Sequence, residues 1–185
     1  MSVTRLMILG LLRERPFHGY EIKKTMKERH MDEWTDIAFG SIYFALRRLT
    51  QEGFAHTQGI EQDGNRPSRT VYAITGAGDR EFFRLLRENW QSDSVDREVL
   101  RSCIIFMQEL QPGEVQRYLR AKANILDGII RHIDEVYADV AAHGAPWTAR
   151  HVCSYDAEVC TRSRDWLSAL ANEIEKCSIT WTVPQ

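Results

Sequence analysis

This sequence lacks the features that mark secreted and membrane proteins. Its N-terminus has one short apolar run, Leu6 to Leu12, followed at once by Arg13, Glu14 and Arg15, and no basic leader with a small-residue cleavage site. No apolar run approaches the roughly 20 residues of a membrane-spanning helix. We therefore expect a cytoplasmic protein that does not enter a membrane.

Cysteine is scarce, and all four cysteines, Cys103, Cys153, Cys160 and Cys177, lie in the second half. Cys153 and Cys160 are two helical turns apart, about 10 Å, which is too far for a disulfide between them. No Cys-x-x-Cys occurs, and the six histidines form no helical pair with an acid between them. We expect reduced cysteines in helix packing, no metal and no cofactor.

The sequence also lacks the common signatures of enzymes. It has no glycine loop for phosphates and no nucleophile elbow, and its carboxylates are dispersed. We expect a protein that is not an enzyme, although a catalytic site assembled from distant residues stays as an alternative.

A strong basic excess is missing too. The 185 residues carry a formal charge of −2, which divides into +2 for residues 1 to 90 (14 Lys and Arg against 12 Asp and Glu) and −4 for residues 91 to 185 (10 against 14). This charge permits nucleic-acid binding by the first half but does not by itself indicate it. The length suits two small modules with real cores.

What the sequence does contain is an unusual helix pattern between Phe39 and Phe54. Ile42, Ala45, Leu46 and Leu49 fall on one side, with Ser41 as a candidate N-cap and Gly53 at the end. The opposite side carries Tyr43, Phe44, Arg47 and Gln51. Aromatic rings beside arginines suit phosphates, guanine edges and thymine methyls better than bulk water.

The neighbouring segments predict a small winged domain. Residues 3–12 and 19–26 read as helices, and the second presents Lys23 and Lys24 outward. Residues 54–60 and 69–75 read as two strands of a hairpin, with Arg66 and Arg69 at or beside its polar tip. Three helices and a two-stranded wing are the order of a winged helix-turn-helix, whose third helix reads DNA.

In order and spacing, several motifs resemble the PadR family of bacterial transcriptional regulators. The resemblance covers roughly residues 3 to 90 and implies a dimer that binds an inverted repeat near a promoter, usually as a repressor released by a small molecule. Phe44 departs from the smaller or polar residues common at its position, which leaves the base preference open. The matching motifs are Gly19-Tyr20-Glu21-Ile22, Gly40-Ser41-Ile42-Tyr43 with Leu46, Arg48 and Leu49, Glu52-Gly53-Phe54, Gly64-Asn65-Arg66-Pro67-Ser68-Arg69, and Tyr72-Ala73-Ile74-Thr75-Gly76-Ala77-Gly78.

The rest of the chain predicts a helical module that makes the dimer. After a helix over residues 76–90, capped by Thr75, a hinge at 91–94 leads to a helix from Val95 to Leu110, a long helix from Gly113 to Ala142 and a last helix from Pro146. The long helix carries a heptad seam with one polar position, Lys122, whose ammonium we expect to reach water. Because one helix partner in the same chain would leave part of this seam exposed, we expect a second subunit to cover it.

We therefore predict a mainly α protein in two domains. Residues 1–90 form a winged helix-turn-helix domain and residues 91–185 an α-helical dimerisation domain. A protein-interaction adaptor on the same fold is the alternative to a DNA-binding regulator. The predicted DNA-binding residues are Ser41, Tyr43, Phe44 and Arg47 in the major groove, Lys23, Lys24 and Arg48 on phosphates, and Arg66 and Arg69 at the wing.

An effector site is the last prediction from the sequence. Phe82, Phe83 and Trp90 cluster before the hinge and would stack on a planar aromatic compound, the ligand class that the resemblance implies. The other interpretation is that these rings are core.

Overall fold

The computed structural model describes residues 3–33, 35, 37, 39–61, 69–176 and 181. The chain divides into two compact units, Met1–Phe106 and Met107–Gln185. Helix α5 thus counts with the first unit, whereas the sequence placed the domain boundary after residue 90. The division into a DNA-binding domain of residues 1–90 and a dimerisation domain of residues 91–185 stays a prediction.

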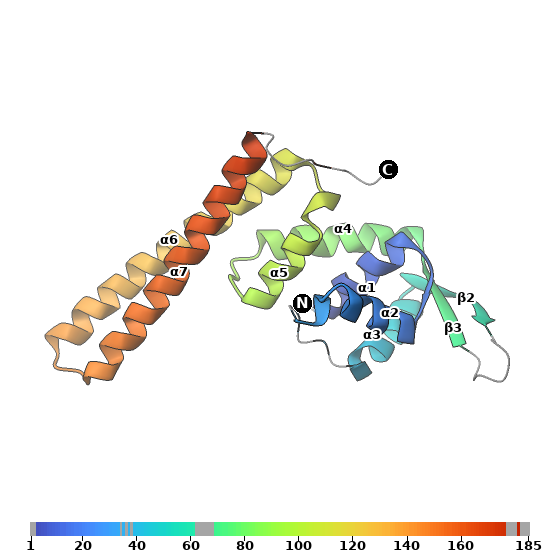
Figure 1. Ribbon diagram of the computed structural model, residues 1–185, viewed down its shortest axis with the longest axis horizontal. Coiled ribbons are helices and arrows are strands. Elements are labelled where there is room, and N and C mark those ends of the chain that lie inside the picture. Colours follow the sequence, from blue (N-terminus) through green and yellow to red (C-terminus); the bar gives the residue numbers. More distant parts are fainter. Residues whose placement is uncertain are drawn as a thin grey trace. The chain divides into compact units, whose positions relative to one another are not determined.

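The first unit is a helical domain with a small antiparallel sheet (Figure 1). It confirms the predicted winged helix-turn-helix order. Its elements are α1 (Val3–Glu14), β1 (Phe17–His18), α2 (Gly19–Glu28), the 3-10 turn η1 (Met31–Glu33), α3 (Phe39–Gln51), β2 (Ala55–Glu61), β3 (Arg69–Ile74), α4 (Gly76–Gln91) and α5 (Arg97–Ile105).

Helix α1 is the centre of this unit. Its stretch from Leu6 to Leu12 is apolar all round, and the side chains there are at most 2% exposed, apart from Gly10, which has no side chain. A helix without a polar face must be covered on every side, and α1 contacts α3, α4, α5 and β3. The expectation that residues 3–12 form a core helix is confirmed.

The sheet has a third strand that the sequence analysis missed. β3 lies between β2 and the two-residue strand β1, in the order β1-β3-β2, with Phe17 opposite Tyr72 and His18 opposite Val71. A strand of two residues is too short for an alternating pattern, so only pairing with β3 defines it. Its consequence is that the start of α2 is held beside the wing.

The ends of α3 differ partly from expectation. The helix already begins at Phe39, so Ser41 lies within its first turn and is not the N-cap. Gly53 does end the helix: its φ of +78° is the left-handed conformation that glycine adopts without a Cβ penalty. The amide of Phe54 then donates to the carbonyl of Leu49 at 2.8 Å.

The helix predicted from Val95 to Leu110 is shorter in the structure. It ends at Ile105, and a 3-10 turn, η2 (Met107–Glu109), follows. Phe106 stacks edge-on against Phe82 with ring centroids 5.3 Å apart. Phe106 therefore packs into the first unit, and α5 ends at the residue just before it.

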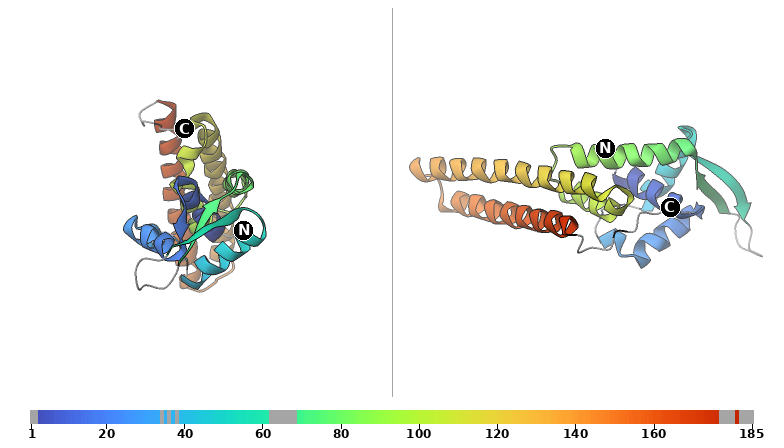
Figure 2. Two further views of the ribbon diagram at one scale, coloured as in Figure 1. Left: turned by 90° about the vertical axis from the view of Figure 1, so that its right-hand side faces the viewer. Right: turned by 90° about the horizontal axis from the view of Figure 1, so that it is seen from above.

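The second unit is a helical hairpin. α6 (Pro112–Ala142) and α7 (Trp147–Glu175) run antiparallel, as the view from above in Figure 2 shows. Ion pairs join them at both Arg120–Glu175 and Arg164–Asp127, each 2.8 Å. The single long helix and the last helix starting after Pro146 are confirmed.

The seam of α6 is buried along only part of its length. Val115, Leu119 and Leu126 are at most 3% exposed, whereas Val136 is 38% exposed. Lys122 is 1% exposed, so the expectation that its ammonium reaches water is wrong: the packed neighbours enclose the whole side chain, not its stem alone.

Three of the four cysteines lie among the described residues. Cys103, Cys153 and Cys160 are free thiols, Cys103 is buried, and burial raises the pKa of the Cys160 thiol. Cys177 lies outside the described residues.

Candidate nucleic-acid interface

The outward face of α3 has the aromatic and basic character that the sequence predicted. Tyr43 is 38% and Phe44 56% exposed, and Arg47 is also exposed. The inward residues Ile42, Leu46 and Leu49 are at most 2% exposed. Ser41 is half-buried in the first turn of the helix. A rigid helix therefore presents two rings and a guanidinium together.

Tyr43 is positioned by the start of α2. A Cβ added at Gly19 would lie 2.6 Å from Cε1 of Tyr43, so a side chain at residue 19 would have to displace the ring. The ring of Tyr43 therefore rests on the backbone of Gly19. This contact links the predicted reading helix to α2.

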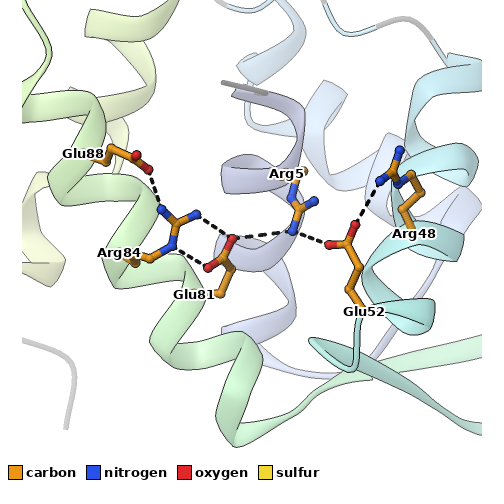
Figure 3. A network of polar contacts seen from close by, with 6 residues as sticks. All are labelled: Arg5, Arg48, Glu52, Glu81, Arg84 and Glu88. Atoms are coloured by element: carbon orange, nitrogen blue, oxygen red, sulfur yellow. Dashed lines mark hydrogen bonds and ion pairs between the residues drawn. The ribbon is translucent and has the colours of Figure 1, made fainter.

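Arg48 is held by a chain of charges that crosses the domain (Figure 3). Its guanidinium lies 3.3 Å from Glu52, whose other oxygen is 2.6 Å from Arg5. The hydrogen bond from Arg5 lowers the pKa of Glu52. Arg48 is 57% exposed, so its guanidinium can still face a phosphate while it forms an ion pair with Glu52.

The same chain continues from α1 to α4. Arg5 lies 3.5 Å from Glu81, which accepts two hydrogen bonds from Arg84, and Arg84 also pairs with Glu88 at 2.7 Å. Those hydrogen bonds raise the pKa of Arg84. The network thus ties the end of α3 to α1 and α4.

The two lysines predicted on phosphates lie on the exposed side of α2. Lys23 and Lys24 are both exposed, and Lys24 lies 3.5 Å from Glu28. Both members of this pair are about 60% exposed (62% and 60%), so solvent screens it and a phosphate can replace Glu28.

Arg69 begins β3 and lines one pocket together with Tyr43 of α3. Its guanidinium lies 5.7 Å from the ring centroid of Tyr20, a cation–π distance. The pocket has a volume of about 420 Å³ and will be called the wing pocket. It is lined by His18, Gly19, Tyr20, Tyr43, Arg69, Thr70 and Tyr72. Arg66, also predicted at the wing, lies outside the described residues.

Four of these lining side chains were not singled out from the sequence: His18, Tyr20, Thr70 and Tyr72. What these four residues share is their place in the fold. β1 pairs with β3, and this pairing brings the start of α2 beside the wing. The Gly-Tyr motif at residues 19 and 20 entered the family resemblance, but its spacing alone does not place it near Arg69.

The proposed effector residues are mostly core. Phe82 is fully buried and Trp90 is 1% exposed, while Phe83 is half-buried. The guanidinium of Arg13 lies 4.6 Å from the ring centroids of both phenylalanines. This packing favours the interpretation as core for Phe82 and Trp90, and leaves Phe83 as the reachable ring.

Neither a metal site nor a membrane span is found among the described residues. No group of three or more His, Cys, Asp and Glu side chains there is placed to hold a metal ion. No helix in this part of the chain is long and apolar enough to cross a membrane.

The chain was compared with known families and curated proteins. Residues 8–84 match the transcriptional regulator PadR-like family. The negative transcriptional regulator PadR of Bacillus subtilis (strain 168) is 35% identical over 82 residues, which are 44% of this chain and 44% of that protein. The aligned part thus spans less than half of that relative.

Solved structures of the same relative are similar over more of the chain but with low scores. Bacillus subtilis PadR in complex with operator DNA is 22% identical, covers 94% of this chain and 98% of that chain, and has a TM-score of 0.43. The same protein in complex with p-coumaric acid is 21% identical, with 94% and 99% covered and a TM-score of 0.37.

The family match covers the described elements of the winged domain from within α1 to within α4. It also contains every motif on which the sequence resemblance rested. Over residues 8–84, which are less than half of the chain, this protein is similar to the transcriptional regulator PadR-like family.

Proposed function

We propose that this protein is a sequence-specific regulator of bacterial transcription that binds double-stranded DNA in the cytoplasm. The observation that carries the proposal is the exposed face of α3, where Tyr43, Phe44 and Arg47 stand on a helix whose other side is buried. Such a helix fits the major groove, and an arginine there pairs with the N7 and O6 acceptors of guanine.

Contacts with the backbone of DNA complement this reading face. Lys23 and Lys24 on α2 and Arg48 on α3 would contact phosphates, and Arg69 and Arg66 would do so at the wing. Phosphate contacts supply affinity and register but little sequence information. Ser41, in the first turn of α3, completes the set of residues proposed for the major groove.

We further propose that the protein represses transcription. The relative that aligns with its winged domain is named a negative transcriptional regulator. A dimer bound across a promoter excludes the polymerase without contacting it. A binding function of this kind needs no catalytic residue.

The proposed active form is a homodimer joined through α6 and α7. The distal part of α6 leaves Val136 and Tyr137 38% and 42% exposed. On α7, Tyr155 and Trp166 are 66% and 50% exposed. Apolar stripes of this size on an isolated hairpin are stabilised by a partner, and a second copy supplies the same stripe. Two reading helices then match the two halves of an inverted repeat.

The effector proposal keeps one of the three residues that the sequence predicted for this site. We propose a planar aromatic compound at Phe83, whose ring packs edge-on against Phe82. The test uses Phe83→Leu, because Trp90→Ala would remove a core side chain and destabilise the domain by about 3 to 5 kcal/mol. If aromatic compounds release DNA from Phe83→Leu as readily as from the parent, the site lies elsewhere.

One experiment tests the DNA-binding proposal as a whole. The full chain selects binding sites from a random pool of DNA duplexes, and the selected site is titrated at several salt concentrations. We expect an inverted repeat, and affinity that falls steeply with salt as counterions are released. Absence of any enriched site, with intact folding by circular dichroism, would instead favour a protein-interaction adaptor.

A further inference from the structure

Glu52, the residue that follows α3, lies between two arginines that hold its carboxylate unequally (Figure 3). One carboxylate oxygen lies 2.6 Å from a guanidinium nitrogen of Arg5, and the other lies 3.3 Å from a guanidinium nitrogen of Arg48. For a hydrogen bond between charged groups the first distance is short and the second is long. Glu52 is therefore held chiefly by Arg5 and only loosely by Arg48.

Solvent exposure differs in the same direction as the two distances. The side chain of Arg5 is 23% exposed and that of Glu52 29%, whereas that of Arg48 is 57% exposed. Water and salt screen an ion pair more strongly when its members are exposed. The hydrogen bond from Arg5 is also the largest cause of the lowered pKa of Glu52, and the one from Arg48 is a smaller cause. An anion from outside can therefore replace Glu52 at Arg48 more easily than at Arg5.

Arg5 is fixed by contacts with other parts of the winged domain. Its guanidinium lies 3.5 Å from Glu81 of α4, whose side chain is 10% exposed, and 5.5 Å from the ring centroid of Phe54. Glu81 in turn accepts hydrogen bonds from Arg84. Because these contacts do not involve Arg48, Arg5 stays beside Glu52 when Arg48 turns to another anion.

Arg48 lies on the face of α3 that is proposed to meet DNA. Its guanidinium is 6.0 Å from the ring centroid of Phe44, one turn earlier in the chain, and Glu52 is one turn later. Residues four positions apart are neighbours on the surface of a helix. The attraction of the carboxylate thus decides how far the Arg48 guanidinium is drawn from Phe44 towards Glu52.

We propose that Glu52 competes with DNA phosphates for Arg48, and that Arg5 limits this competition. The proposal rests on the proposed function, in which Arg48 contacts a phosphate. Before DNA binds, the carboxylate is the anion at Arg48. In the complex a phosphate takes its place, and Arg5 remains the cation beside Glu52. Glu52 and Arg5 act on DNA through Arg48 and are positioning residues.

The competition lowers affinity for every duplex alike. A phosphate contact carries no sequence information, so weakening it changes affinity without changing which site is preferred. An exposed ion pair such as that of Arg48 and Glu52 changes an equilibrium constant by no more than about fivefold. The expected effect is therefore modest, uniform across sequences and dependent on Arg48.

The first test is Glu52→Gln, which keeps the size of the side chain and removes its charge. By fluorescence anisotropy, we expect the full chain with this change to bind a labelled duplex of scrambled sequence about two- to fivefold more tightly than the parent. The preference for the selected site over the scrambled one should stay the same. A merely structural role of Glu52 would give the opposite sign, because damage to the fold lowers affinity. Circular dichroism confirms folding.

Two further variants show whether the gain depends on Arg48. In an Arg48→Gln background, Glu52→Gln should bring no gain, because the group for which the carboxylate competes is gone. The matched control is Glu88→Gln, which removes the same charge from the far end of the same network, where Glu88 pairs with Arg84 at 2.7 Å. This control should leave affinity unchanged, since Arg84 is not among the proposed DNA contacts. An equal gain in the control, or in the Arg48→Gln background, would reveal a general effect of charge and overturn the inference.

Arg5→Gln tests the role of Arg5 and should have the opposite sign. Without Arg5 the whole carboxylate is available to Arg48, so affinity for both duplexes should fall about two- to fivefold. Arg5→Lys keeps the charge and should recover most of this loss, and Arg5→Gln should cause no loss in a Glu52→Gln background. A loss that persists in that background would refute the role of Arg5. Glu52→Gln and its combination with Arg48→Gln decide the competition itself, whether or not Arg5→Gln folds.

The same titrations separate this inference from the proposed function. If the folded parent binds neither duplex, the proposed function fails, and this inference fails with it. If the parent binds its selected site and Glu52→Gln binds the scrambled duplex no more tightly than the parent, only the inference fails.

Discussion

Arg47 and Lys24 have different proposed roles in DNA binding. Arg47 stands beside Phe44 on the reading helix, whereas Lys24 lies on α2 next to Glu28. We expect Arg47→Ala to lower affinity for the selected site by about 1 to 3 kcal/mol and to reduce discrimination between sites. Competition with selected and scrambled duplexes measures both effects.

The control for Arg47 is Lys24→Ala. A phosphate contact carries no sequence information, so this change should weaken all duplexes alike and lower the slope of log affinity against log salt by about 1. Equal losses of discrimination in both variants would contradict the proposed division between base and phosphate contacts.

Glu52 should make the free energy of unfolding of the winged domain depend on pH. The hydrogen bond from Arg5 lowers the pKa of Glu52 below its ordinary 4.5. A lowered folded pKa means that the carboxylate stabilises the fold fully above that ordinary value, and that the contribution is lost as pH falls through the folded pKa. Glu52→Gln should therefore lose about 1 kcal/mol at pH 7, after allowance for solvent screening, and almost nothing at strongly acidic pH.

The measurement is urea unfolding at several pH values. Glu28→Gln is the matched control, because Glu28 is 60% exposed and its ion pair with the exposed Lys24 is long, at 3.5 Å. We expect this control to change stability by less than about 0.5 kcal/mol. A loss in Glu52→Gln that is the same at pH 7 and at acidic pH would show that the ion pair is not its cause.

At the scale of elements, Gly10 of α1 lies close to the ring of Phe106, the residue that follows α5. A Cβ at Gly10 would strike the ring tip of Phe106. Because both sides of the contact are packed, Gly10→Ala should destabilise the protein by about 1 to 3 kcal/mol, although alanine favours helices. Thermal unfolding of the full chain measures the change.

Removing the ring tests the cause of that loss. In a Phe106→Leu background the shorter side chain leaves space for the new methyl group, so Gly10→Ala should cost less than in the parent. The two changes acting additively would argue that Gly10 is needed for some reason other than contact with Phe106.

Sequence patterns predicted some helices and strands correctly and missed or misplaced others. Strong amphipathic periodicity made α3 and its buried residues recognisable, and the turn residues at 61–68 separated the two strands of the hairpin. The strand β1 was missed, because two residues carry no period. The end of α5 was placed too late, since Leu110 continues the apolar spacing while the chain has already turned at Phe106.

At the scale of the whole molecule, the first compact unit includes α5 and ends at Phe106. A fragment that folds by itself should therefore also end at Phe106. We expect residues 1–106 to fold as a monomer, whereas residues 1–90 expose the face of Phe82 that Phe106 covers and should melt at a lower temperature. Circular dichroism and sedimentation compare the two fragments. A tight dimer of residues 1–106 would refute the assignment of dimerisation to α6 and α7.

Loss of the second unit should also weaken DNA binding. Two half-sites read by one dimer gain from effective concentration, which can exceed either single affinity by about 10² to 10⁴. A single charge in the full chain tests the same surface: Trp166→Glu on the exposed side of α7 should dissociate the dimer and reduce affinity for the inverted repeat. Unchanged sedimentation would place the interface elsewhere.

The amino-acid sequence by itself determined the order of the longer helices and strands, the buried side of α3 and the long helices α6 and α7. These features depend on periodicity, caps and turn residues, which act over a few neighbouring positions. The tertiary structure alone decided the wing pocket, the ion network from Arg48 to Glu88 and the burial of Lys122. Each of these joins residues far apart in the chain, and local patterns carry no information about which distant side chains will meet.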